Sequence, residues 1–235
     1  MKVRIKFAKH GVMKFIGHLD VMRYFQKALR RAEIDVKFSE GMSPHMTMSF
    51  AAPLGVGLTS DGEYVDIELN TPVSTEEAVR RLNSVMVEGM EILDFRQIEE
   101  GKAGKAMSLV AAADYTVTFR KGYAPNGEWQ SAISGFFARK SITVIKETKK
   151  GESKIDIRPL IYQMGVHSGE VSMRLATGSA ANLKPELVME AYMEWKEFEL
   201  QPFALEVNRC EVYADLGKAG KHRFVSLNEL GQRIV

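Results

Sequence analysis

Alternation of apolar and polar positions predicts most of the strands in the first part of the chain. Val3, Ile5 and Phe7 alternate with basic or small residues, which is the period of a strand with one buried face. Further segments alternate in the same way or form short apolar runs. They predict strands at 36–38, 46–50, 64–69 and 92–98.

A second periodicity predicts helices. Over 19–32 the apolar residues return every three or four positions, as on one face of an α-helix: Met22, Phe25, Leu29 and Ala32. Ser74 is followed three residues later by Glu77, the signature of a capping box. This pair predicts a helix that begins near 75 and runs to 86.

The same types of element recur after a linker-like stretch at 99–105 that holds two glycines and two lysines. A hairpin is predicted from 142–145 and 155–161, turning near 149–152. Pro185 near the start of 184–195 suits the first turn of a helix. The other elements expected here are strands at 115–119, 171–176 and 205–212 and a helix at 127–139.

The order of these elements predicts the fold class. Residues 1–100 read strand, helix, strand, an irregular stretch, strand, helix, strand, and 108–214 repeat this order with one extra strand. We therefore predict an α+β protein of two tandem ferredoxin-like (split βαβ) halves with antiparallel sheets. A basic C-terminal tail at 215–235 would follow. Such a fold does not by itself determine a function.

Composition adds limits on the kind of protein. With 235 residues, of which 45% are hydrophobic and 26% charged, the chain is typical of soluble globular proteins. No run of eighteen apolar residues and no signal-peptide pattern occurs, so we expect a cytoplasmic protein without a membrane partner. Cys210 is the one cysteine, which excludes a disulfide framework and an iron–sulfur cluster held by this chain alone. We expect no cofactor and no metal.

The distribution of charge is more informative than the net charge of +2. On a helix over 18–32, four cations fall within an arc of roughly 100°, opposite the apolar side. Such a stripe is suited to a phosphate backbone, and the predicted hairpin adds further lysines. A solvated face or a protein-binding face would show the same pattern. The predicted nucleic-acid-binding residues are Arg23, Lys27, Arg30, Arg31, Lys146, Lys149, Lys150 and Lys154, and another basic group lies at Lys218, Lys221, His222 and Arg223.

Two short polar motifs are candidates for chemistry. In GHLD, His18 and Asp20 lie at the start of the predicted helix, and His45 follows in the SPH motif. If the SPH loop folds over the helix start, these three side chains could form an acid–base pair or an anion site. Ser39, Ser43 and His45 could cradle a phosphate. The competing interpretation is structural hydrogen bonding, and the spacing matches no known metal signature.

Recognised catalytic motifs are missing from the sequence. It contains no nucleophile elbow, P-loop or HExxH motif, and no GxGxxG in a βαβ context. These absences argue against covalent catalysis by such a system.

Most of the chain resembles a known family. The run from FAKHGVMKFIGHLD through SEGMSPHM to EYVDIEL, together with IDIRPLI and LKPELV, is similar to a bacterial radical-SAM-linked domain of unknown function. Its members occur fused to, or encoded beside, radical SAM proteins. Where members tend to read GFNPHP, this chain reads GMSPHM, so a role of the asparagine is in doubt at Ser43. The resemblance implies a radical SAM protein as partner and no established activity.

These observations lead to one functional hypothesis with two alternatives. The hypothesis is an accessory RNA-binding or substrate-presenting domain that acts with a radical SAM enzyme in the modification of RNA, such as tRNA or rRNA. The first alternative is a stand-alone RNA-modifying or RNA-cleaving enzyme that uses Asp20, His18 and His45 in a cleft between the halves. The second is a protein-interaction scaffold.

Overall fold

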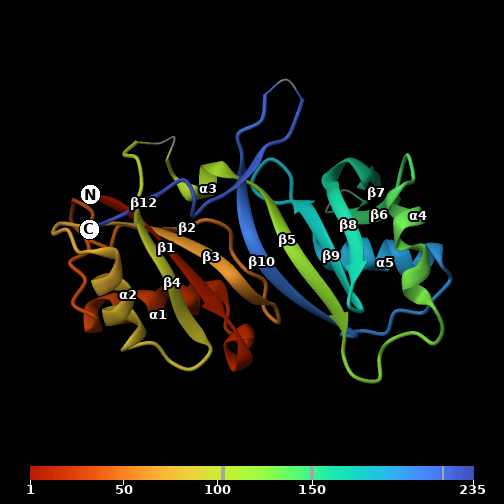
Figure 1. Cartoon of the computed structure of the whole chain (residues 1–235), viewed down its shortest axis with the longest axis horizontal. Helices are drawn as coiled ribbons and strands as arrows, with labels where there is room; N and C mark the ends of the chain where they lie inside the picture. Colours follow the sequence, from red (N-terminus) through yellow and green to blue (C-terminus); the bar gives the residue numbers. More distant parts are fainter. Residues whose placement is uncertain (102–103, 149–150, 219) are drawn as a thin grey trace.

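One large mixed β-sheet forms the frame of the molecule (Figure 1). The computed structural model describes residues 1–101, 104–148, 151–218 and 220–235, and for 146–148 the backbone alone. The strands are β1 (Lys2–Lys9), β2 (Met48–Phe50), β3 (Thr59–Glu68), β4 (Met90–Gln97), β5 (Val110–Phe119), β6 (Thr143–Thr148), β7 (Gly151–Asp156), β8 (Ile161–His167), β9 (Glu170–Ala176), β10 (Leu205–Asp215), β11 (Phe224–Ser226) and β12 (Gln232–Arg233).

The helices of the described residues are fewer than the strands. The α-helices are α1 (His18–Arg31), α2 (Thr75–Asn83), α3 (Ala106–Leu109), α4 (Ile133–Phe137) and α5 (Pro185–Trp195). Three short 3₁₀ turns are η1 (Gly11–Phe15), η2 (Trp129–Ala132) and η3 (Arg158–Leu160).

The order of the strands corrects the predicted fold class. Ten strands share one sheet in the order β12-β4-β1-β3-β10-β5-β9-β8, with β2 added beside β3 and β11 beside β10, while β6 and β7 form a separate pair. The prediction of two ferredoxin-like halves, each with its own antiparallel sheet, is therefore wrong. The two parts are joined where β10 pairs with β3, and this pairing is parallel.

The junction between β3 and β10 is short and is reinforced by side chains. Thr59 and Ser60 pair with Asn208 and Arg209. The Thr59 hydroxyl donates to Asn208 Oδ1 at 2.8 Å, and the Ser60 hydroxyl donates to the Arg209 carbonyl at 2.9 Å. An exposed strand edge carries unpaired backbone N–H and C=O groups, which can pair with another chain. Pairing two edges with each other satisfies these groups. This explains why the sheet continues from one part into the other.

Gly62 lets the two strands come this close. A Cβ atom at position 62 would lie 2.8 Å from the carbonyl oxygen of Cys210 and 3.1 Å from Glu211 Cα. Both neighbours are backbone atoms, which cannot swing aside. A glycine is therefore required at this position of β3.

Buried ion pairs connect the same strands. The Arg209 guanidinium donates to both carboxylate oxygens of Glu63, at 2.7 and 2.5 Å, with both side chains about 5% exposed or less. Arg4 on β1 donates to Asp66 on β3, and also to the carbonyls of Leu227 and Gly104. Burial makes an unpaired charge costly, so each of these arginines is stable only with its partner in place. These pairs account for the buried side chains of Arg4, Glu63 and Arg209.

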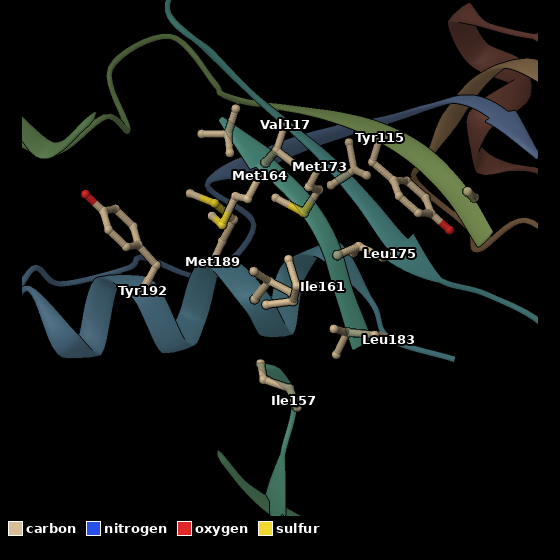
Figure 2. Packing of buried hydrophobic residues seen from close by; sticks show 14 of the residues in the cluster. Tyr115, Val117, Ile157, Ile161, Met164, Met173, Leu175, Leu183, Met189 and Tyr192 are labelled. Atoms are coloured by element: carbon tan, nitrogen blue, oxygen red, sulfur yellow. The ribbon is translucent and has the colours of Figure 1, made fainter. Parts of the chain in front are cut away.

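Two hydrophobic clusters lie along the sheet. In the first, α1 and α2 pack on β1, β3 and β4, and the rings of Phe7, Phe25 and Phe50 contact one another. Figure 2 shows the second, in which Met189 of α5 points toward Met164 of β8. Tyr192 of the same helix packs against the Phe136 ring of α4. Helices thus cover one face of each part of the sheet.

Most helices and strands were predicted near their observed positions. The structure contains α1, α2, α5 and β1, and the Ser74 hydroxyl accepts from the Glu77 amide as the capping box predicts. The predicted helix at 127–139 is reduced to η2 and α4. The 36–38 segment makes isolated bridges only. The strands β11 and β12 lie within 215–235, which the sequence pattern treats as a tail.

Candidate nucleic-acid interface

The basic face of α1 is fixed in place by its apolar side. Val21, Phe25, Ala28 and Leu29 are buried against the sheet, each 5% exposed or less. The predicted phosphate-binding side chains are all exposed on the opposite side of the helix: Arg23, Lys27, Arg30 and Arg31. We call these four residues the basic stripe. Because packing anchors the helix, the stripe forms a rigid row of cations.

Few neighbouring carboxylates neutralise the stripe. Arg23 pairs with Asp20 at 3.2 Å in an exposed contact, and Arg31 donates to the Val85 carbonyl at 3.2 Å. Within the described part of the chain, no ion pair or hydrogen bond of the Lys27 or Arg30 side chain is found. The stripe therefore keeps a surplus of positive charge.

The neighbouring helix α2 adds less positive charge than its sequence indicates. Arg80 is bound to the carboxylate of Glu77 on the same helix, at distances from 2.7 to 2.9 Å. Arg81 donates to the Glu33 carbonyl just beyond α1. Because these contacts occupy both arginines, α1 is the main source of positive charge on this side.

The predicted basic hairpin does not extend the stripe. Lys149 and Lys150, with the side chain of Lys146, lie outside the described residues, and Lys154 is exposed on β7. The strands β6 and β7 form their own sheet, at the opposite end of the molecule from α1 (Figure 1). Lys154, the one hairpin lysine whose side chain is described, therefore lies on a different surface from the stripe.

The structure does not bring His18, Asp20 and His45 together. His18 lies at the start of α1, packs edge-on against Phe50 and lines a small cavity with Lys9. The loop with His45 adjoins the other end of β1, where Lys2 lines the same pocket as His45. Asp20 is exposed and pairs with Arg23. His18 and His45 line different cavities and Asp20 lines neither, which removes the geometric basis for the enzyme alternative.

Two of the three predicted phosphate-binding residues share a pocket. Ser39 and His45 line a cavity of about 300 Å³, whereas Ser43 is exposed and does not line it. The Ser39 hydroxyl lies 2.9 Å from His45 Nδ1 and accepts from the His45 amide. Lys2 and Lys105 also line this pocket, a contribution that the sequence pattern does not reveal because they are distant in the chain.

Carboxylates limit what this pocket can bind. Asp66 and Glu68 line it together with the two lysines. Asp66 is engaged by Arg4, and Glu68 accepts from Lys37 at 2.8 Å, which keeps the pKa of the Glu68 carboxyl below its usual value. Positive and negative groups therefore balance, and the pocket has no clear preference for a phosphate.

Lys9 is a further buried charge that the sequence pattern does not predict. Its side chain is nearly inaccessible, and its ammonium donates to the Ile16 carbonyl at 3.1 Å. Burial lowers the pKa of Lys9, an effect that Glu63 opposes and Arg209 reinforces. The cavity beside it measures only about 10 Å³, the space of a single water. This position is too small for a substrate.

A large cavity lies elsewhere and has the wrong charge for a nucleic acid. It measures about 720 Å³ and runs along α5, whose Glu186, Glu190 and Glu194 line it beside Phe198 and Phe203. Burial and the neighbouring Glu186 raise the pKa of the Glu190 carboxyl. A row of carboxylates repels phosphate, so this cavity does not compete with the basic stripe.

Comparison with known proteins now places the chain. A family described as uncharacterized proteins conserved in bacteria, DUF2344, matches residues 2–185. The chain belongs to this family. The match includes α1 with its basic stripe and ends as α5 begins. Among the curated proteins, none matches the chain.

Two structural properties complete this description. No helix of the described residues is long and apolar enough to cross a membrane. Within the same residues, no group of three or more histidine, cysteine or acidic side chains is arranged to hold a metal ion.

Proposed function

We propose that this protein is an accessory RNA-binding or substrate-presenting domain that contacts structured RNA through the basic stripe of α1. The observation that carries the proposal is the row of four exposed cations, of which Lys27, Arg30 and Arg31 have no carboxylate partner among the described residues. From Arg23 to Arg31 the helix rises about 12 Å, which corresponds to about three or four nucleotides along one strand of a duplex. The stripe therefore has the length and sign of a phosphate-backbone contact.

Rigidity strengthens this proposal over a purely solvated face. A helix anchored by four buried residues presents its cations at fixed spacing, so binding need order only the side chains. Arg and Lys contacts to phosphates release counterions and provide affinity without reading the sequence. We expect recognition of shape and charge rather than of a base sequence at α1.

The test uses a variant that removes three of the four positive charges of the stripe. Replacing Arg23, Lys27 and Arg30 by alanine should weaken binding of a labelled RNA hairpin by about 10- to 100-fold, at about 0.5 to 1 kcal/mol for each exposed contact. Arg31 is left intact because it donates to a backbone carbonyl. Fluorescence anisotropy measures the affinity.

The control removes three exposed lysines on the other part of the molecule, Lys121, Lys140 and Lys184. It changes the net charge by the same amount, so equal loss of affinity in both variants would point to nonspecific attraction. Binding that is unaffected by the Arg23, Lys27 and Arg30 variant would contradict the proposal.

We further propose that the partner is a radical SAM enzyme. The support is the resemblance of the GHLD-to-EYVDIEL region to radical-SAM-linked domains; the family match itself carries no such link. Cys210 alone cannot hold an iron–sulfur cluster, so the partner would supply that chemistry. Co-expression with a neighbouring gene product that carries a CxxxCxxC motif should yield a complex on affinity purification. Separate elution of the two proteins at micromolar concentration would contradict this partnership.

A further inference from the structure

A cluster of aromatic side chains lies on the sheet face opposite α5. Tyr115, Met173 and Leu175 face the buried cluster beside α5, so their neighbours along the strands, Asp114 and Arg174, point to the other face. The Tyr213 hydroxyl donates to Asp114 at 2.9 Å, which places Tyr213 on that same face.

Next to Tyr213, the rings of Tyr162, His222 and Phe224 pack against one another. The His222 ring stacks on Phe224 with centroids 5.1 Å apart and an angle of 10° between the planes. Tyr162 lies 4.7 Å from His222 and 4.9 Å from Phe224. The Arg174 guanidinium lies over Tyr213 at 4.4 Å. We call Tyr162, Arg174, Tyr213, His222 and Phe224 the aromatic platform.

The platform is partly accessible. The His222 side chain is 51% exposed, although its ring contacts Phe224 and Tyr162 and its Nδ1 is bound to Asp215. The other members are half-buried, so their edges form the floor. Bases that are not paired bind proteins by stacking on aromatic and histidine rings, and this surface offers both. The Arg174 guanidinium is held within the platform, over Tyr213 and Phe224 and against Asp114.

Hydrogen-bonding groups adjoin the rings. A pocket of about 180 Å³ shares Asp114 and Arg174 with this region and is also lined by Gln163, Ser172 and Thr116. This volume is below the roughly 300 Å³ at which pockets for drug-sized ligands begin. It therefore suits a single planar ring with polar edges better than a whole cofactor.

The chain between β10 and β11 adds positive charge next to the platform. Lys218, Lys221 and Arg223 are exposed there, on the blue hairpin that projects at the top of Figure 1. Asp215 accepts from the Gly217 and Arg223 amides and from His222 Nδ1, so one carboxylate orients both the hairpin and the ring. These exposed cations are therefore available to contact the phosphates next to a stacked base.

We propose that the aromatic platform binds unpaired bases of single-stranded RNA, with Lys218, Lys221 and Arg223 contacting the adjoining phosphates. This inference rests on the proposed RNA function but uses a different surface from the basic stripe. The stripe would hold a duplex by its backbone, whereas the platform would hold a loop or an end by its bases. Together they would give preference for RNA that has both.

The experiment uses the full chain with two labelled probes, a short oligouridylate and a fully paired RNA duplex. His222→Ala and Phe224→Leu remove ring surface while keeping the chain otherwise intact, and a combined variant removes both. Phe203→Leu is the matched control, because Phe203 is an exposed ring on the α5 side. Melting temperatures confirm that each variant is folded.

We expect the combined variant to bind oligouridylate roughly 5- to 100-fold more weakly, the range found for loss of base stacking, with duplex affinity and the Phe203→Leu control unchanged. Unchanged oligouridylate binding by the folded combined variant would overturn the inference. So would ultraviolet crosslinks of oligouridylate that map away from Tyr162, His222 and Phe224.

The experiment can refute either proposal without refuting the other. Oligouridylate binding that depends on the platform, without any duplex binding, would refute the role of the basic stripe and keep this inference. Duplex binding that depends on the stripe, with platform variants equal to the wild type for oligouridylate, would do the reverse. If neither probe is bound, both proposals are wrong.

Discussion

Lys9 is a buried residue whose positive charge lowers the stability of the folded protein. Its ammonium is almost inaccessible and has one hydrogen-bond acceptor, the Ile16 carbonyl, among the contacts of the described residues. Burial removes water from the ammonium, and no close carboxylate replaces that water, so the charged form is disfavoured. The lowered pKa of Lys9 reflects this loss of hydration. This loss of stability exists only while Lys9 carries its charge.

Lys9→Met should therefore raise the stability of the protein at neutral pH. Below the folded-state pKa, Lys9 is charged in both states, so folding includes the full cost of burying the charge. This cost declines as the pH rises through the folded-state pKa and is gone above the ordinary value of 10.5. The gain from Lys9→Met should shrink over that interval. Urea denaturation across the pH range measures it.

The exposed Lys121→Met serves as the control and should show no such trend. A loss of stability for Lys9→Met that is the same at neutral and high pH would contradict this account. It would mean that the hydrogen bond to Ile16 outweighs the burial of the charge.

At the scale of elements, local patterns were sufficient for some predictions and insufficient for others. The helix α1 and the cap of α2 were predictable because periodicity and the Ser74–Glu77 pair act within a few residues. The strands β11 and β12 were missed because they have only three and two residues, too few to show a period, and the partner of β12 is β4, far along the chain. Parallel pairing of β10 with β3 joins residues about 150 positions apart, which no local pattern shows.

Gly62→Ala tests this junction. The added methyl group would collide with the Cys210 carbonyl, so we expect a loss of about 1–3 kcal/mol in the free energy of unfolding. Gly165→Ala is the matched control, since the nearest atom to its Cβ would be Ser172 Oγ at 3.9 Å, an ordinary contact. Chemical denaturation of both variants compares them. Equal stabilities would show that the junction is looser than described.

At the scale of the whole molecule, the sequence indicated the kind of surface but not its extent. The basic stripe could be predicted because four cations share one face of a single helix. The separation of His18 from His45 could not, because it depends on which end of β1 each loop adjoins. The aromatic platform combines β8, β9, β10 and the start of β11, so it exists only after the sheet has formed.

The salt dependence of RNA binding tests the central claim most directly. If about four phosphates are neutralised by the basic stripe, the logarithm of the association constant for duplex RNA should fall with the logarithm of salt concentration at a slope of roughly −3 to −5. Replacing Arg23, Lys27 and Arg30 by alanine should reduce the magnitude of the slope by about 3, close to 1 for each lost contact. The Lys121, Lys140 and Lys184 control should keep the wild-type slope. A slope that is the same in the wild type and the stripe variant would contradict the assignment of α1 as the RNA-binding surface.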